Sequence, residues 1–325
     1  MNNLENKNNI KVNIKYLKNI LIIMMFIMLV FTGCTTQTVD TSKFNIVTSF
    51  YPMYIATANI VDGVEDVELS NLTATTTGCL HDYQLTTANI ITLSTADVLV
   101  INGGGMESFI EKAVNTYSGL NIVDASENIL DAHEHEYAEP YEEDNTEHSE
   151  HNHHEHGENA HIWVSISMHI KQVKNIRDEL VKLDVKNAEK YTENANNYIL
   201  KLENLKQEMI ESLQNIDSKQ IITFHEAFEF FAEEFGLEIV AVIEREPGTY
   251  PSAGEVADII DLVRSKNVKA IFVEPQYSRS AADTIARETG INVYTLDPIV
   301  TGDLNKDAYL EIMNNNLKAL EEALK

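Results

Sequence analysis

The feature that most constrains the fold is a regular alternation of short β-rich runs with helical patterns, beginning at Phe44. This alternation is typical of an α/β fold whose sheets contain mostly parallel strands. The apolar, β-branched runs predict strands over residues 44–50, 67–72, 98–101, 221–224, 237–242, 270–273 and 292–296.

Helical patterns occupy the stretches between these strands. Two of them, Ser167–Leu183 and Asn187–Leu213, are long and carry apolar residues at helical spacing. A helix of that length can bridge two lobes. We predict shorter helices over residues 53–61 and 307–324, after Thr86 and Ser252 as caps, and from about residues 106 and 226.

The chain is long enough for two lobes of ordinary size. It has 325 residues, and 44% of them are hydrophobic. We predict two lobes with mostly parallel sheets, joined by a long helix, with a metal site in the cleft between them. The expected divisions are a signal peptide (1–33), a tether (34–43), an N-terminal lobe (44–166) with an acidic loop (131–158), connecting helices (167–215) and a C-terminal lobe (216–325).

The N-terminus has the pattern of a bacterial lipoprotein signal. Lysines precede an apolar run, Ile20–Phe31, that is short for a membrane span but suits a signal-peptide core. Thr32-Gly33-Cys34 resembles the end of a lipobox, with Phe31 where Leu is usual. We therefore expect Cys34 to be lipidated and the mature protein to be anchored on the outer side of a bacterial cell membrane.

Cys79 is the only other cysteine. Once Cys34 is acylated, no intramolecular disulfide is available. Cys79 lies two residues before His81 and could act as a soft metal ligand, but a free thiol is the simpler interpretation.

The net charge and the histidines point to cations as ligands. A formal charge of -27 argues against nucleic acid, whose binding needs a basic face. Seven of the chain's eleven histidines lie in the acidic loop, which we expect to be solvated and to gather metal ions weakly. These accessory candidates are His133, His135, His148, His151, His153, His154 and His156.

Four other side chains are placed to form a metal site. His225 and Asp297 directly follow predicted strands, and the loop after the second predicted strand carries His81. Ligands bind beyond the carboxyl ends of parallel strands, and His161, just before the long helices, could face the same cleft. Three imidazoles and one carboxylate suit a four-coordinate Zn²⁺. The alternative for each histidine is ordinary hydrogen bonding, and Asp297 before a proline could simply start a turn.

Two further motifs are interpreted as structural. Gly103-Gly104-Gly105 lacks the Lys-Ser/Thr of a phosphate loop and predicts a tight turn. His169 lies inside a helical pattern and predicts a packed, structural histidine.

The sequence resembles the cluster A-I metal-binding lipoproteins of ABC importers, specifically those of the zinc-uptake type. The resemblance covers residues 44–325 and implies a solute-binding protein that hands Zn²⁺ to a membrane permease driven by a cytoplasmic ATPase. It implies the same four ligands, and we expect a monomer. The phrases that carry it are His81-Asp82-Tyr83-Gln84-Leu85-Thr86, His161-Ile162-Trp163, Phe224-His225-Glu226-Ala227-Phe228, Glu274-Pro275-Gln276-Tyr277-Ser278 and Leu296-Asp297-Pro298.

Within this resemblance, His225 favours zinc, because manganese-type relatives usually carry Glu at that position and carboxylates suit Mn²⁺. Mn²⁺ or another divalent metal is the alternative cargo. The chain departs from the family pattern at Leu80, Thr87 and Ala160, where proline is common.

Two other functions remain open. His225-Glu226 could suggest a zinc hydrolase, but position 229 is Glu, so the H-E-x-x-H motif is incomplete. A cell-adhesion protein or passive metal buffer would use the same site without a permease. We therefore expect a binding protein rather than an enzyme.

Overall fold

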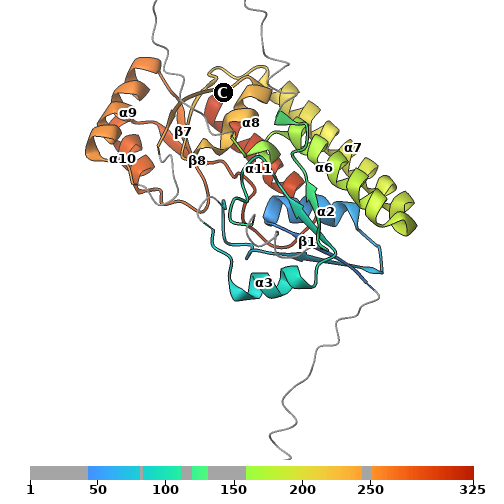
Figure 1. Ribbon diagram of the computed structural model, residues 1–325. Helices are drawn as coiled ribbons and strands as arrows, with labels where there is room; N and C mark the ends of the chain where they lie inside the picture. The colour runs from blue at the N-terminus through green and yellow to red at the C-terminus, as the bar shows by residue number, and fades with distance from the viewer. Residues whose placement is uncertain (1–42, 81–82, 111–118, 131–158, 244–249) are drawn as a thin grey trace, which may run out of the picture. The chain divides into compact units, whose positions relative to one another are not determined.

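A computed structural model describes residues 43–80, 83–110, 119–130, 159–243 and 250–325. The signal peptide, Cys34 and the whole His-rich loop lie outside the described residues. These described residues form one compact unit (Figure 1).

Within the described residues, two four-stranded sheets carry the fold and every strand pairing is parallel, which confirms the predicted α/β class. The strand orders are β2-β1-β3-β4 and β6-β5-β7-β8, so the same topology occurs twice. The first sheet contains β1 (Phe44–Thr48), β2 (Val67–Asn71), β3 (Val98–Ile101) and β4 (Asn121–Asp124). The second contains β5 (Gln220–Thr223), β6 (Glu238–Val242), β7 (Ala270–Val273) and β8 (Asn292–Thr295).

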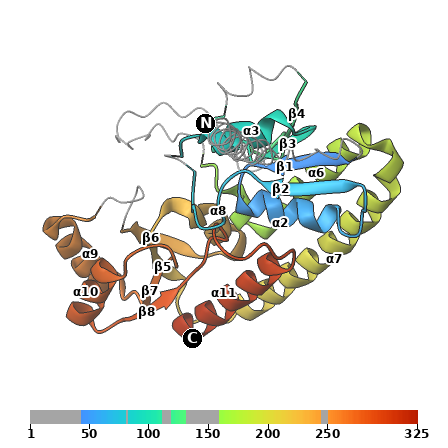
Figure 2. The same ribbon diagram turned by 90° about the horizontal axis from the view of Figure 1, so that it is seen from below.

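Helices connect the strands and cover the sheets. Figure 2 shows α7 and α11 side by side, and α2 contacts both of them. No helix in the described part of the chain is long and apolar enough to cross a membrane. The α-helices are α2 (Tyr51–Ile60), α3 (Thr87–Ser94), α6 (Ile166–Leu183), α7 (Ala188–Leu213), α8 (Glu229–Phe235), α9 (Ala253–Lys266), α10 (Ser280–Thr289) and α11 (Ala308–Leu324); the short 3₁₀ turns are η1 (Ile162–Val164), η2 (Val185–Asn187) and η3 (Glu226–Phe228).

Helix starts follow the predicted capping chemistry. The Thr86 and Ser252 side chains each accept a hydrogen bond from the backbone three residues ahead, which confirms both caps. Two elements were not predicted, β4 and α10. The helix expected from about Met106 is not seen over residues 106–110, which form turns.

The loop after β3 confirms the predicted glycine turn. Gly103, Gly104 and Gly105 all have positive φ, and a Cβ on Gly103 would lie 1.9 Å from Asp124 Oδ1. The buried Glu107 carboxylate accepts hydrogen bonds from the backbone N–H groups of Asn102 and Gly103 and from the Ser49 hydroxyl. A side chain of the protein therefore occupies the position that a bound anion would take in a phosphate loop.

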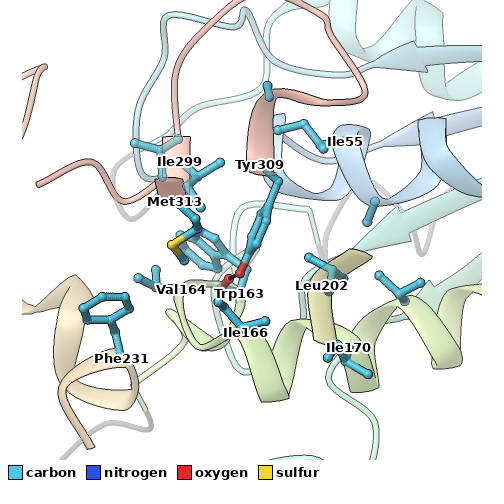
Figure 3. Packing of buried hydrophobic residues seen from close by; sticks show 14 of the residues in the cluster. Ile55, Trp163, Val164, Ile166, Ile170, Leu202, Phe231, Ile299, Tyr309 and Met313 are labelled. Atoms are coloured by element: carbon cyan, nitrogen blue, oxygen red, sulfur yellow. Dashed lines mark hydrogen bonds between the residues drawn. The ribbon is translucent and has the colours of Figure 1, made fainter. Parts of the chain in front are cut away.

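One hydrophobic cluster continues from the first sheet to the second. It contains Ile46 and Val100 from the first sheet and Ile221 and Phe272 from the second. Trp163 lies within it, fully buried, in edge-to-face contact with Phe50 at 5.0 Å between ring centroids. Figure 3 shows this region, in which residues from η1, α2, α6, α8 and α11 meet.

Hydrogen bonds at Trp163 tie the same regions together. Its indole N–H donates to the Pro298 carbonyl at 2.7 Å. The Tyr309 hydroxyl donates to the Trp163 carbonyl at 2.9 Å (Figure 3). The Trp163 side chain thus joins η1 to the segment that follows β8.

Replacing Trp163 by Phe should lower the free energy of unfolding by about 2–4 kcal/mol. The change leaves a cavity and deprives the Pro298 carbonyl of its donor. Urea unfolding followed by circular dichroism measures the loss. Leu200→Ala on the exposed face of α7 is the control and should change stability by about 0.5 kcal/mol or less. A Trp163→Phe protein as stable as the unaltered one would contradict this account of the core.

Candidate metal centre

Two buried histidines meet ring to ring. His161 directly precedes η1, and His225 follows β5 with one residue between them. Their Nε2 atoms are 3.2 Å apart, and each residue is only 3% exposed. The predicted convergence of residues distant in sequence therefore holds for this pair.

Asn159 fixes the orientation of the His161 ring. Its Oδ1 lies 2.8 Å from His161 Nδ1 and also accepts the His161 backbone N–H at 3.0 Å. An amide oxygen can only accept, so Nδ1 carries the proton. The Nε2 lone pair then points toward His225, in the state that a metal requires.

Asn159 is itself anchored to the second half of the fold. Its Nδ2 donates to a Glu229 carboxylate oxygen at 2.8 Å and to the Glu226 carbonyl at 3.1 Å. On the other side of the segment, Asn102, which follows β3, donates to the Ala160 carbonyl at 2.9 Å. His161 is thus held from both sheets.

Cys79 completes a group of three potential ligands. Its Sγ lies 3.6 Å from His161 Nε2, and the ligand atoms of Cys79, His161 and His225 all lie within 4.8 Å of one another. Burial raises the pKa of the Cys79 thiol well above its usual value, and the nearby Glu274 carboxylate raises it further. Without a metal the thiol is therefore protonated. On sequence grounds Cys79 is a possible soft ligand, with a free thiol as the simpler interpretation.

Asp297 follows β8, as predicted, but is not a member of this three-residue group. One of its carboxylate oxygens accepts the Ile299 backbone N–H at 2.7 Å, and its own backbone pairs with the Asn316 side chain. Burial raises the pKa of the Asp297 carboxyl, while the bond from Ile299 lowers it. One carboxylate oxygen of Asp297 is therefore engaged in a turn, as the alternative interpretation expects.

Glu274 is a buried carboxylate that the sequence did not single out as a site candidate. It follows β7 directly, is 1% exposed, and accepts a hydrogen bond from Gln276 at 2.6 Å. Glu274 meets the same criterion that identified His225, because each is a polar side chain just beyond a buried parallel strand.

His169 is structural, as predicted. It is fully buried and stacks on Tyr309, with ring centroids 4.1 Å apart and planes 8° from parallel. Burial lowers the pKa of its imidazole to about 4, so the ring is neutral at physiological pH.

The other predicted ligands cannot be placed. His81 lies outside the described residues, as do the accessory histidines His133, His135, His148, His151, His153, His154 and His156. The group formed by Cys79, His161 and His225 is therefore the part of the site that the structure brings together. Imidazole nitrogen and thiol sulfur are donors for borderline and soft cations such as Zn²⁺.

Comparison with sequence families gives an independent result. Residues 46–323 match the model of the family described as zinc-uptake complex component A, periplasmic. The High-affinity zinc uptake system protein ZnuA of Bacillus subtilis is 33% identical over 297 residues, which cover 87% of this chain and 88% of that protein. The Zinc-binding lipoprotein AdcA of Streptococcus pneumoniae is 29% identical, and the match spans 89% of this chain but only 58% of that longer protein.

Solved structures show the same fold. The SBP FpvC from Pseudomonas aeruginosa in complex with Mn²⁺ superimposes with a TM-score of 0.71 at 30% identity, covering 87% of this chain and 98% of that one. The Zn(II)-bound ZnuA-like domain of Streptococcus pneumoniae AdcA superimposes with a TM-score of 0.71 at 27% identity, covering 87% of this chain and 99% of that domain. Laminin binding protein (Lmb) of Streptococcus agalactiae superimposes with a TM-score of 0.72 at 26% identity, covering 87% of this chain and 100% of that one. Lmb is described as having adhesin and metal transporting activity.

Replacing Asn159 by Ala should weaken Zn²⁺ binding roughly tenfold to a hundredfold without changing the number of ions bound tightly. The His161 ring would lose the acceptor that fixes its tautomer and orientation. Isothermal titration calorimetry measures the change. The matched control is Asn194→Ala on α7, which likewise removes two hydrogen bonds donated by a side-chain amide, here to the carbonyl oxygens of Ile60 and Asp62. Equal affinities in the two variants would contradict an orienting role for Asn159.

Proposed function

This chain belongs to the family of zinc-uptake complex component A proteins, and on that premise we propose that it is the extracytoplasmic zinc-binding component of an ABC importer. The observation that carries the proposal is the buried pair His161 and His225, whose Nε2 atoms are 3.2 Å apart. Asn159 orients the His161 ring so that its Nε2 can bind a metal ion. Zn²⁺ is the transported cargo rather than a resident cofactor.

The proposed ligands are His81, His161, His225 and Asp297. Neutral imidazoles and a carboxylate bind Zn²⁺ tightly, and a filled shell suits capture and release better than catalysis. Mn²⁺ is the alternative cargo and ranks second, because it prefers oxygen donors whereas an imidazole pair favours zinc. The histidines between residues 133 and 156 are proposed to collect zinc weakly and supply it to this site.

Delivery requires partners at the membrane. We propose that the loaded protein, a monomer anchored through lipidated Cys34, docks on a permease whose cytoplasmic ATPase drives transfer. The metal site of this chain holds the ion until docking. Its buried imidazoles and the contact from Asn159 keep the site formed when no permease is bound. The proposed lobes are residues 44–166 and 216–325, with connecting helices over residues 167–215 between them.

Local backbone geometry argues against the hydrolase alternative. His225 has an extended backbone, and α8 begins only at Glu229, after the η3 turn. The metalloprotease motif needs both of its histidines on one continuous helix, one turn apart. Glu229 instead accepts a hydrogen bond from Asn159. We therefore propose a binding protein without enzymatic activity. A cell-adhesion role would use the same metal site, and Lmb, which has the same fold, is described as combining adhesin and metal transporting activity.

Replacing His81, His161 or His225 singly by Ala should abolish the tightest Zn²⁺ site in calorimetry, since each removes a proposed ligand. Asp297→Ala should weaken it. The control is deletion of residues 134–157, which should lower the total zinc bound but retain the tight site. Retention of that site in all three histidine variants would refute the assignment. Its loss in the deletion would move the site to the His-rich loop.

Zinc affinity should fall as the pH drops from 7.5 to 5.5. An ordinary imidazole has a pKa of about 6.5 and binds a metal only when deprotonated, so protons compete with Zn²⁺ below that value. For a histidine with that ordinary pKa the expected loss at pH 5.5 is roughly tenfold. It is smaller where burial lowers the pKa, as at His169. Competition titrations with a chelator of known pH dependence measure it, and an affinity that is flat over this range would count against a histidine site.

A further inference from the structure

We infer that the Cys79 thiolate is itself a ligand of the captured metal ion, which makes the centre a mixed sulfur and nitrogen site. The inference rests on the proposed function, because it requires that His161 and His225 bind the cargo. In this inference Cys79 takes the position of Asp297 in the four-coordinate shell, because Cys79 and not Asp297 belongs to the group formed with His161 and His225. It concerns which metal the site selects.

Two of the three spacings between the donor atoms match those around a tetrahedral ion. Zn–N bonds of about 2.05 Å and a Zn–S bond of about 2.3 Å at tetrahedral angles give an N···N edge of about 3.3 Å and an S···N edge of about 3.6 Å. The structure has 3.2 Å between the imidazole Nε2 atoms and 3.6 Å between Cys79 Sγ and His161 Nε2. The third edge, from Cys79 to His225, is no longer than 4.8 Å.

The surroundings of Cys79 place the sulfur at this position. Cys79 forms no disulfide, and its side chain packs against the same hydrophobic cluster that contains Trp163. Leu80, the next residue, is fully buried and holds the backbone there. In this partly buried position the sulfur lies 3.6 Å from His161 Nε2.

Ligation by Cys79 has a defined proton balance. The neutral thiol gives up its S–H proton as the Zn–S bond forms, and that proton passes to water, because a metal ion deprotonates a coordinating thiol. No electrons are transferred. Binding of Zn²⁺ should therefore release one more proton than the histidines alone account for.

The consequence is selectivity for soft and borderline metals. Thiolate sulfur strengthens binding of Zn²⁺ and Cd²⁺ far more than binding of Mn²⁺, which prefers carboxylate and water oxygens. Since FpvC, a protein of the same fold, is seen with Mn²⁺, fold alone does not exclude manganese. Cys79 supplies this chain with a means of rejecting it.

The test uses the full chain with Cys34→Ser, purified in detergent, so that Cys79 is the single thiol. Loaded with Co²⁺ as a spectroscopic substitute for Zn²⁺, this protein should show a thiolate-to-cobalt charge-transfer band in the near ultraviolet. Cys79→Ser and Cys79→Ala should lose that band and keep the visible bands of bound Co²⁺. The Zn²⁺ affinity of both variants should fall by at least about tenfold, because losing a residue that only hydrogen-bonds to a metal ligand already costs that much. The Mn²⁺ affinity should change little.

The outcomes separate this inference from the proposed function. If Co²⁺ and Zn²⁺ bind tightly in a manner that depends on His161 and His225 but no charge-transfer band appears, Cys79 is not a ligand and the importer function stands. If no tight zinc site exists, both fail. The first readout needs no variant at Cys79, so misfolding of a substituted protein cannot obscure it. Persistence of the band in Cys79→Ala would likewise overturn the inference.

Discussion

The structure depends on how the short segment from Asn159 to Trp163 is held. Four hydrogen bonds from different parts of the chain converge on it: Asn159 to Glu229, Asn102 to the Ala160 carbonyl, Trp163 to the Pro298 carbonyl, and Tyr309 to the Trp163 carbonyl. His161 lies in the middle of this segment. A ligand on an isolated loop would have to be ordered when the metal binds, whereas here its position is fixed by folding.

Strain and burial occur together beside this segment. Ile299 has a positive φ of 63° although its side chain is β-branched and fully buried, and Gly302 approaches Tyr51 so closely that a Cβ would lie 2.5 Å from its hydroxyl oxygen. Both residues belong to the stretch between β8 and α11 that supplies Asp297 and the Pro298 carbonyl. The core shared by the two sheets provides the free energy that maintains these conformations, because Trp163 and Ile299 belong to the same cluster.

Local signals predicted elements well where they were strong. The strand at Ala270–Val273 is entirely apolar, and the helix after Ser252 has a complete capping box, so both were found. The two missed elements have weak signals. In β4 (Asn121–Asp124) only Val123 is buried, and in α10 only Ala282 and Ile285 are, so neither has an apolar pattern long enough to be distinctive. The helix expected from about Met106 does not form over residues 106–110, because a glycine turn does not determine where the following helix begins; residues 111–118 lie outside the described part of the chain.

By itself the sequence determined the fold class, the acidic character and the list of possible ligands, because strand alternation, net charge and residues next to strand ends are local properties. It named His161 and His225 but could not measure their separation. Tertiary structure decided that the two rings touch, that Asn159 sets the tautomer of one of them, and that Cys79 lies against the pair while Asp297 is engaged in a turn. Such contacts join residues up to 82 positions apart, and only packing of the complete core fixes distances over that span.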